Sequence, residues 1–376
     1  RGPLTRGRHA AGMRNDWDLV VVGASFAGAA CALAAREYGL RVCVLERKRD
    51  PGIKLHTTGI IVREAAEGTW LSRLPPALVH RVEGVQLHAP NLRRMRLSRP
   101  GYYFLATDTP GVMRWLVGEL RDAGVELRLA TPFQHAERER DGWNVRDAGF
   151  ARFLVGADGA KSRVAERAGL GRVRDFLYGV EHEFDGLRLA RGDALHCFLS
   201  KRFAPGYIGW ALQAPTGVQV GLAARYRGTH APTPDADAFL RHVAPVLGID
   251  AGRKPDAIRA GLVPCGGPIA RIAADGVILT GDAAGIVSPL TAGGIHSAWK
   301  HGWAVGEAIA RHLRHGGPSP ELVAQQAVPR YRAKRLLRRA FDTMQMDWPF
   351  DLLIGTPPLR WAAERVYFNR GRDPGG

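Results

Sequence analysis

Short apolar runs separated by glycine-rich turns dominate the first part of the chain. Residues 19–22 are Leu-Val-Val-Val, a continuous apolar run of the kind found in a parallel strand that is buried on both faces. Small and apolar residues continue to Gly39 and predict a helix, and a second apolar run at 41–45 predicts another strand. The pattern therefore predicts a β-α-β unit and an α/β fold with a parallel sheet.

The turn after the first run contains candidate phosphate-binding residues. They are Gly23, Ser25, Phe26, Ala27 and Gly28. The turn follows a G-x-G-x-x-G pattern except that Ser25 stands at the middle glycine. Free N–H groups and the helix dipole at such a turn favour a pyrophosphate. The alternative is a turn that serves packing alone.

The second strand ends in two further candidate residues, Glu46 and Arg47. Glu46 lies 18 residues after Gly28. An acidic residue at the end of the second strand can accept hydrogen bonds from the hydroxyls of an adenosine ribose. The turn and Glu46 together predict a dinucleotide site.

Two later strand-and-turn units carry a carboxylate at the same point. One strand ends at Gly156 and is followed by Asp158 and Gly159. The other, residues 277–279, stops at Gly281 and Asp282. Small residues follow it, and a helix begins near Gly293; the candidate contacts after Asp282 are Gly285, Pro289, Gly293, Gly294 and Ile295. Few residues of this segment have large side chains, and one carboxylate stands at its start. This pattern predicts that a bulky polar ligand lies against the backbone here.

In this order, G-x-S-x-x-G…E, G-A-D-G and G-D-A-A-G, the chain resembles FAD-dependent oxidoreductases of the para-hydroxybenzoate hydroxylase type over about residues 17–315. The resemblance implies that Asp282 binds the ribityl chain of FAD and that Asp158 lies near the pyrophosphate. It also implies that the helix near Gly293 directs its N–H groups at the flavin. Arg114 matches an arginine that points toward the cofactor; a solvated helix residue is the alternative.

Residues 205–226 indicate a branch of this family. They resemble the P-x-x-Y-x-W-x-F-P segment of geranylgeranyl reductase-like flavoproteins, in which the Tyr and Trp line the substrate cavity. Here two residues separate Tyr207 from Trp210 instead of one, and Ala214-Pro215 replaces Phe-Pro. The segment predicts strands at 207–214 and 218–226. Aromatic packing between strands is the alternative.

The loop at 52–61 supplies the remaining candidates. The cysteine that geranylgeranyl reductases carry in this loop is missing. Thr57, Thr58 and Gly59 are expected to approach the isoalloxazine ring. His56 is a candidate proton donor because histidine titrates near neutral pH. An ordinary loop histidine is the alternative.

The fold class expected is α/β: a Rossmann-like FAD-binding domain with a parallel sheet, a β-rich substrate domain and a helical C-terminal region. The expected boundaries are a disordered leader at 1–16, FAD-binding segments at 17–75, 96–175 and 266–315, substrate-domain segments at 76–95 and 176–265, and C-terminal helices at 316–376. No second G-x-G-x-x-G turn occurs. A nicotinamide donor, if one is used, would bind transiently in a groove.

Composition and charge limit the classes of partner that this protein is expected to bind. The 376 residues carry a formal charge of +17, which favours anionic partners. No nucleic-acid-binding module is present, so specific nucleic-acid binding is not expected. The four cysteines match no metal site, and we expect no metal in a reduced, cytoplasmic protein. No apolar run is long enough to span a membrane.

The segment 330–368 combines a basic helix, apolar on one face, with several aromatic residues. This predicts either a peripheral membrane contact or a cap over a hydrophobic cavity, and a lipid substrate would suit both.

The function predicted is an FAD-dependent oxidoreductase that transfers hydride between the flavin and an apolar substrate such as a prenyl chain or quinone. The alternative is an aromatic monooxygenase that uses NAD(P)H and O2. No His or Cys occupies a linkage position in the glycine-rich turns, so noncovalent FAD is expected.

Overall fold

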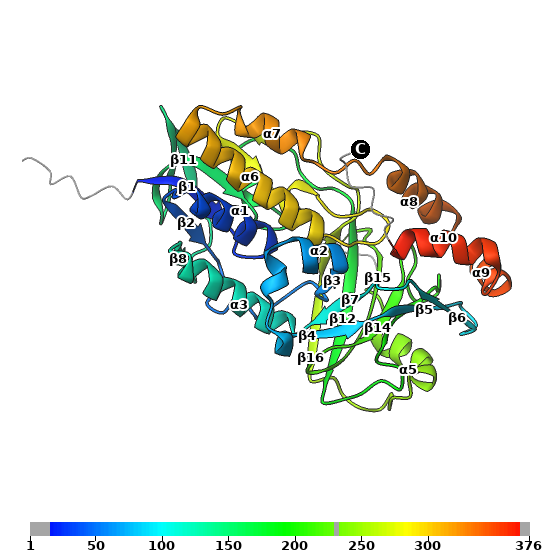
Figure 1. Ribbon diagram of the computed structural model, residues 1–376. Helices are drawn as coiled ribbons and strands as arrows, with labels where there is room; N and C mark the ends of the chain where they lie inside the picture. The colour runs from blue at the N-terminus through cyan, green and yellow to red at the C-terminus, as the bar shows by residue number, and fades with distance from the viewer. Residues whose placement is uncertain (1–15, 229–232, 369–376) are drawn as a thin grey trace, which may run out of the picture.

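The computed structural model describes residues 16–228 and 233–368. It consists of a mainly parallel sheet with helices, a large mainly antiparallel sheet and a set of C-terminal helices (Figure 1). The predicted leader at 1–16 lies, apart from Asp16, outside the described residues. The predicted fold class is confirmed, and the exact domain boundaries stay a prediction.

The eight-stranded sheet has the order β17-β18-β11-β1-β2-β8, with β10 and β9 added beside β11. From β18 to β8 the strands are parallel. Its strands are β1 (Trp17–Val22), β2 (Val42–Leu45), β8 (Glu126–Arg128), β9 (Ala136–Glu139), β10 (Gly142–Val145), β11 (Gly149–Gly156), β17 (Ala273–Ala274) and β18 (Val277–Leu279). The apolar runs of β1, β2 and β18 are buried, as a central parallel strand requires.

Helix α1 (Phe26–Glu37) lies between α3 (Thr109–Asp122) and α6 (Ile295–His315) (Figure 1). The contact with α6 depends on two glycines of that helix. A Cβ at Gly302 would lie 2.2 Å from the carbonyl oxygen of Ala27, and one at Gly306 would lie 2.2 Å from that of Cys31. The two backbones therefore touch, and this contact packs the middle of α6 against the first half of α1.

The second sheet has seven strands in the order β16-β12-β15-β14-β13-β5-β6, and only β5 and β13 run parallel. Its strands are β5 (Gly84–His88), β6 (Arg94–Ser98), β12 (Phe176–Asp185), β13 (Ala194–Phe198), β14 (Gly209–Gln213), β15 (Gly217–Arg225) and β16 (Ala257–Pro264). β6 lies largely beyond residue 95, where the sequence analysis ended the first substrate segment. A smaller antiparallel sheet joins β3 (Ile60–Val62), β7 (Phe104–Thr107) and β4 (Val79–Val82).

The two faces of the seven-stranded sheet are covered by different helices. In β13, Phe198 packs with α5 (Ala236–Leu247), whereas Cys197 packs with residues of the C-terminal helices. This follows from the alternation of side chains along a strand. The short helix α2 (Arg63–Gly68) lies between β3 and β4 of the three-stranded sheet, and α4 (Arg163–Arg167) follows β11 of the eight-stranded sheet.

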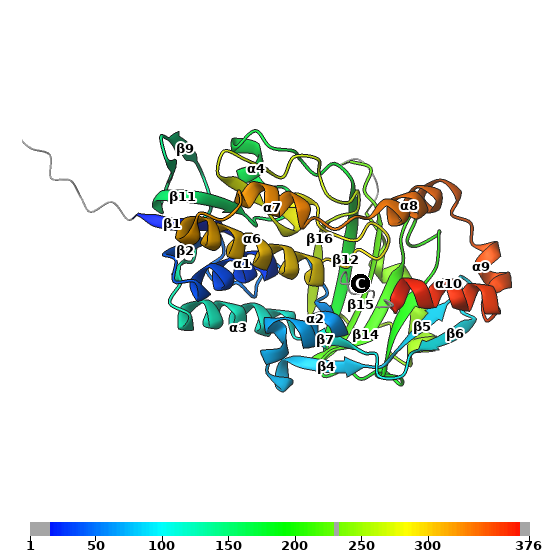
Figure 2. The ribbon, with the colours of Figure 1, turned by 45° about the horizontal axis from the view of Figure 1, so that its top comes forward.

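Four helices follow α6 in the part of the chain that the structure describes: α7 (Pro320–Gln326), α8 (Arg332–Met344), α9 (Trp348–Leu353) and α10 (Pro357–Tyr367). Figures 1 and 2 show α8 to α10 beside the seven-stranded sheet, away from β1 and β2. Side chains anchor them there. Asp347 and Asp351 accept hydrogen bonds from the backbone N–H groups of Lys201 (2.7 Å) and Asn91 (2.9 Å). None of the helices within 16–228 and 233–368 combines the length and apolarity needed to span a bilayer.

Candidate active site

Four turns predicted to bind the cofactor lie together at one edge of the parallel sheet. Hydrogen bonds between neighbouring strand ends hold them in line: Gly23 N–H to Leu45 O (2.8 Å), Ala157 N–H to Val22 O (2.8 Å) and Thr280 N–H to Gly156 O (2.9 Å). The carboxyl edge of a parallel sheet is where ligands of such folds bind. Motifs far apart in the sequence thus lie at one edge of the sheet.

The first turn has the shape that phosphate binding needs. Gly23 has φ +105°, and a Cβ there would lie 2.3 Å from the carbonyl oxygen of Ala157. A Cβ at Gly28 would lie 1.9 Å from the carbonyl oxygen of Gly23. No side chain caps α1, although Ser25 occupies its N-cap. The first N–H groups of α1 are therefore left for a ligand.

Glu46 is buried at the end of β2, directly beside this turn. Its Oε2 accepts a hydrogen bond from Ala24 N–H (3.0 Å) and its Oε1 accepts one from Lys48 N–H (2.9 Å). Each carboxylate oxygen can accept a second hydrogen bond, so the group can also bind ribose hydroxyls. Arg47 is exposed next to it.

Asp158 caps the short helix α4. Its Oδ1 accepts from Ser162 Oγ (2.6 Å) and its Oδ2 accepts from Arg163 N–H (2.7 Å). Burial raises the pKa of this carboxyl. Gly159 follows with φ +85° and open space beside its Cα. Asp158 thus holds the turn in shape, and contact with the pyrophosphate edge stays a prediction.

Asp282 differs from Glu46 and Asp158 because its carboxylate has no hydrogen-bond partner among the described residues. Burial raises its pKa to about 6. It lies near Gly294, where α6 begins without a side-chain cap. A carboxylate without a protein partner beside free helix N–H groups fits a ligand that brings its own hydroxyl donors, as the ribityl chain of FAD does.

The loop from Asp282 to α6 is compact and glycine-dependent. Gly285 has φ +69°, and a Cβ there would lie 2.7 Å from the carbonyl oxygen of Gly267. Ser288 N–H donates to the carbonyl oxygen of Gly293 (3.0 Å) and closes the loop. The remaining predicted contacts of this segment lie in or next to it: Gly281, with φ +59°, buried Pro289, and Ile295, the first residue of α6.

Asp282 is expected to make the stability of the FAD-free protein depend on pH. Its pKa is raised in the folded state, because burial disfavours the ionised carboxylate. The free-energy cost of burying this anion is therefore absent below about pH 4 and grows as the pH rises toward about 6. Relative to Asp282→Asn, the wild type should lose about 2 kcal/mol of unfolding free energy over this window. Urea unfolding at several pH values measures the difference. If the free energy of unfolding changed with pH by the same amount in both proteins, the prediction would be contradicted.

The loop at 56–59 is held against the two other sheets. Gly59 has φ +80°, and a Cβ there would lie 2.2 Å from the hydroxyl oxygens of Thr107 and Thr109. Thr57 O accepts from Arg259 Nη1 (3.0 Å). His56 is exposed, and its Nδ1 lies 2.7 Å from the carbonyl oxygen of Ala260. The loop position is therefore set by tertiary contacts at each end.

Glu181 of β12 is a site residue that the sequence analysis missed. It is buried, and its Oε2 accepts hydrogen bonds from Thr58 Oγ1 (2.7 Å) and Trp210 Nε1 (2.7 Å). Its Oε1 has no hydrogen bond among the described residues and lies 3.8 Å from Arg259 Nη1. Burial raises the pKa of Glu181, while Arg259 opposes that shift. One carboxyl group thus connects the 56–59 loop to Trp210.

Tyr207 and Trp210 pack in one apolar cluster with Leu177, Ala223 and Cys265. The predicted strand at 207–214 is shorter than expected, because β14 begins at Gly209 and Tyr207 lies in a turn before it. The two side chains therefore share one cluster despite their spacing of three. The hydroxyl of Tyr207 donates to the carbonyl oxygen of Thr291 (2.5 Å), in the loop before α6.

Arg114 lies on α3 and forms a two-pronged ion pair with Asp50. Its Nε is 3.0 Å from Oδ1 and its Nη2 is 2.7 Å from Oδ2 of that residue. The side chain is 54% exposed, so solvent screens the pair. The arrangement holds the start of the 50–59 loop on α3, and a contact between Arg114 and the cofactor stays a prediction.

Two sequence signals could have located the missed residues. Glu181 and Glu183 follow Leu177 and Gly179 at period two on one face of β12, and Arg259 lies directly opposite Glu181 in the sheet register. Gly302 and Gly306 show the spacing of a close helix contact. In both cases the partner element is far away in the chain, so the pattern alone does not identify the contact.

A family model described as an FAD binding domain matches residues 16–340, so the chain belongs to this family of FAD-binding proteins. Digeranylgeranylglycerophospholipid reductase 2 of Methanopyrus kandleri is 29% identical over 323 residues, which cover 81% of this chain and 79% of that protein. The corresponding reductase of Methanocaldococcus jannaschii is 25% identical and covers 83% of this chain and 81% of its own length.

Solved structures agree on the fold. A geranylgeranyl bacteriochlorophyll reductase-like protein of Thermoplasma acidophilum superposes with a TM-score of 0.80 at 17% identity, covering 94% of this chain and 97% of that one. A triple mutant of the flavin-dependent brominase Bmp2 superposes with a TM-score of 0.65 at 16% identity, covering 93% of this chain and 94% of that one. At these identities the likeness concerns the fold. With the family match and the sequence relatives, it confirms the predicted resemblance to geranylgeranyl reductase-like FAD-dependent oxidoreductases.

Proposed function

We propose that this protein is an FAD-dependent reductase that saturates carbon–carbon double bonds in prenyl chains of a lipid. The observation that carries the proposal is an apolar cluster joined to two loops that the resemblance places near the flavin. Tyr207 is hydrogen-bonded to Thr291 in one loop, and Trp210 is connected through Glu181 to Thr58 in the other. Relatives named as reductases of digeranylgeranylglycerophospholipids support the substrate class.

The described residues fit FAD as the cofactor. The uncapped starts of α1 and α6 offer N–H groups to phosphate and flavin oxygens. Glu46 has acceptor capacity for the ribose, and Asp282 has it for the ribityl hydroxyls. When bound, FAD supplies hydride transfer. Reduction of a double bond also requires a proton, which the protein must deliver.

His56 is the proposed source of that proton. Its Nδ1 faces the carbonyl oxygen of Ala260, which can only accept a hydrogen bond, so Nδ1 carries a hydrogen and Nε2 remains for proton exchange. Tyr207 is less suitable because burial raises its pKa and its hydroxyl hydrogen is already donated to Thr291. We therefore assign Tyr207 and Trp210 to the wall that contacts the apolar chain.

The electron donor in this proposal is NAD(P)H, bound transiently in a groove beside the cofactor. The sequence contains a single phosphate-binding turn of the G-x-G-x-x-G kind, and it is assigned to FAD. A test is the rate at which NADH and NADPH bleach the oxidised flavin anaerobically. A protein reduced by dithionite but by neither nucleotide would contradict this part of the proposal.

FAD is expected to be held without a covalent bond. The residues of the two glycine-rich turns offer no histidine or cysteine side chain as an attachment point. Acid precipitation of the purified protein should therefore release all flavin into the supernatant. Yellow colour that persists in the washed pellet would contradict this prediction.

The substrate class is tested with reduced protein under anaerobic conditions. Addition of a digeranylgeranyl phospholipid should restore the absorbance of oxidised flavin, and the lipid should gain two hydrogen atoms per double bond by mass spectrometry. The fully saturated lipid is the matched control and should leave the flavin reduced. Oxygen consumption coupled to a hydroxylated aromatic product would instead support the monooxygenase alternative.

A lipid substrate makes membrane contact through α8 to α10 part of the proposal. Large apolar side chains are exposed there: Leu336, Leu337, Met346, Trp348, Leu352, Leu353, Trp361 and Val366. Exposed arginines lie among them, for example Arg332 and Arg365. Apolar and cationic groups on one surface suit the interface of an anionic bilayer.

Vesicle sedimentation tests this contact. Binding is expected to anionic phosphatidylglycerol vesicles, and much less to neutral phosphatidylcholine vesicles of the same size. Trp361→Ser should lower the bound fraction, because it removes an exposed aromatic side chain. Equal binding of wild type and variant would indicate that this surface serves another partner.

A further inference from the structure

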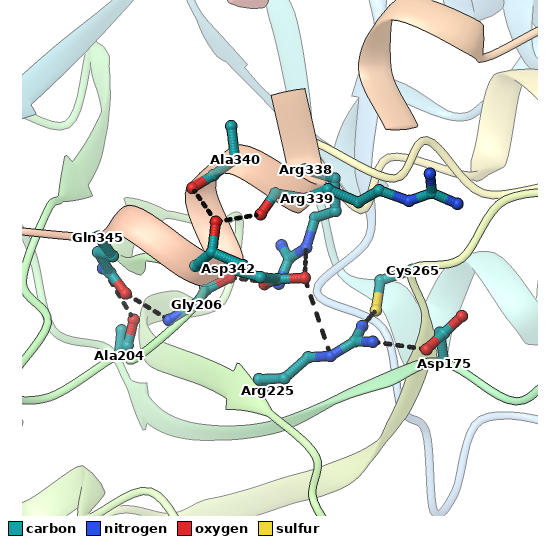
Figure 3. A network of polar contacts seen from close by, with 11 residues as sticks. Asp175, Ala204, Gly206, Arg225, Cys265, Arg338, Arg339, Ala340, Asp342 and Gln345 are labelled. Carbon is teal, nitrogen blue, oxygen red and sulfur yellow. Dashed lines mark hydrogen bonds and ion pairs between the residues drawn. The ribbon is translucent and has the colours of Figure 1, made fainter. Parts of the chain in front are cut away.

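One arginine of α8 is buried although the helix around it is exposed. Leu336 and Leu337 are 69% and 54% exposed, whereas Arg338 is 4% exposed. Desolvating an arginine is costly unless its donors are used. Arg338 therefore lies on the side of α8 that packs against the rest of the protein (Figure 3).

The donors of Arg338 serve two acceptors. Its Nη2 donates to Asp342 Oδ1 (2.6 Å) and to the carbonyl oxygen of Gly206, and its Nε donates to Asp342 Oδ2 (3.2 Å). Asp342 also lies 3.9 Å from Nε of Arg225 on β15. Arg225 in turn contacts Asp175, so α8 is tied to the seven-stranded sheet through charges (Figure 3).

Both backbone polar groups of Gly206 are bound, one by Arg338 of α8 and the other by Gln345, the residue that follows this helix. Its carbonyl accepts from Arg338, and its N–H donates to Gln345 Oε1 (2.5 Å). The position requires glycine, because φ is +79° and a Cβ would lie 3.2 Å from Asp342 Oδ1. The buried side chains of Arg338 and Gln345 thus hold the two peptide units that flank the Gly206 Cα.

The residue after Gly206 is Tyr207, the aromatic residue that the proposed function assigns to the wall contacting the apolar chain. Its backbone N–H donates to Ala204 O (2.9 Å), and its hydroxyl reaches Thr291 in the loop before α6. A shift of the Gly206 backbone would therefore move Tyr207 relative to that loop.

We propose that Arg338 and Gln345 are positioning residues for Tyr207, so that α8 sets the wall of the active site from outside it. The inference rests on the proposed function only for the role of Tyr207 as a wall residue. It connects the surface proposed to contact lipid with the position of an aromatic side chain at the site, and it makes docked α8 a condition for substrate binding.

The first test is hydrogen exchange on the FAD-loaded protein. Arg338→Gln is expected to speed exchange in a peptide covering 204–207 at least tenfold. Arg339→Gln removes the same charge from the next, exposed residue; it should keep wild-type exchange there and lose only vesicle affinity. Equal exchange in the two variants would overturn the proposal. Asp342→Asn, which keeps the arginine but weakens its hold, should fall between wild type and Arg338→Gln.

The second test is a double-mutant cycle with Tyr207→Phe, read as KM and kcat for the prenyl lipid in detergent. Arg338→Gln should raise KM about tenfold and leave kcat within about twofold, since it alters the wall and not the hydride transfer. In the Tyr207→Phe background the same change should raise KM much less. Additive effects would overturn the positioning role. Fast exchange at 204–207 in a protein inactive on prenyl lipids would overturn the proposed function and support the positioning role.

Discussion

Glu46→Ala is expected to weaken FAD binding about a hundredfold, which corresponds to ~2.7 kcal/mol. The carboxylate accepts hydrogen bonds from the N–H groups of Ala24 and Lys48, so it holds the turn before α1 in shape. Its oxygens can also accept hydrogen bonds from the ribose. Hydrogen bonds to a charged group contribute about 1.5–3 kcal/mol each, and the variant loses at least one with the ligand. Titration of FAD-free protein, followed by flavin fluorescence, measures the effect.

Two variants make the Glu46 result specific. Glu37→Ala removes an exposed carboxylate from the end of α1 and should bind FAD as the wild type does. Glu46→Gln keeps one carbonyl acceptor and should fall between the two. Wild-type affinity in Glu46→Ala would mean that the ribose does not bind at this edge of the sheet, and the assignment of the first turn would fail with it.

Glu181→Ala is expected to lower the free energy of unfolding by about 3 kcal/mol. The change leaves the donors of the half-buried Thr58 and Trp210 without their buried acceptor and deprives Arg259 of a neighbouring charge. Each unsatisfied buried donor costs about 1–3 kcal/mol. Arg259 keeps its ion pair with Glu183, which limits the loss. Urea denaturation of the FAD-loaded protein measures the difference.

The matched control for Glu181→Ala is Glu181→Gln. Its carbonyl can still accept from Thr58 and Trp210, and burial already disfavours the charged form of Glu181, so we expect a loss below about 1 kcal/mol. Glu181→Ala should also shift the visible flavin spectrum, because the 56–59 loop loses an anchor, whereas Glu183→Gln should leave it unchanged. Equal stability of the Ala and Gln variants would contradict a hydrogen-bonding role.

The cofactor region could be predicted from the sequence because its signals are local. A buried parallel strand must be apolar along its length, and a close turn must use glycine. Gly23, Glu46 and Asp282 were predicted as cofactor contacts in this way, and the parallel strands bring the turns that carry them to one edge of the sheet. The same locality explains why the family resemblance could be seen in separate short motifs.

The substrate side depended on the tertiary structure because its contacts join distant segments. Glu181 and Trp210 meet because β12 and β14 both pair with β15 in a defined register. Thr58 reaches Glu181 only when the 56–59 loop packs against this sheet. Tyr207 belongs to the same apolar cluster as Trp210 because β14 begins after it, which strand periodicity did not predict. Amphipathic spacing identified α8 as a helix with a basic face. Only packing decided that Arg338 turns inward to Gly206, because a buried charge is stable only where its acceptors are already in place.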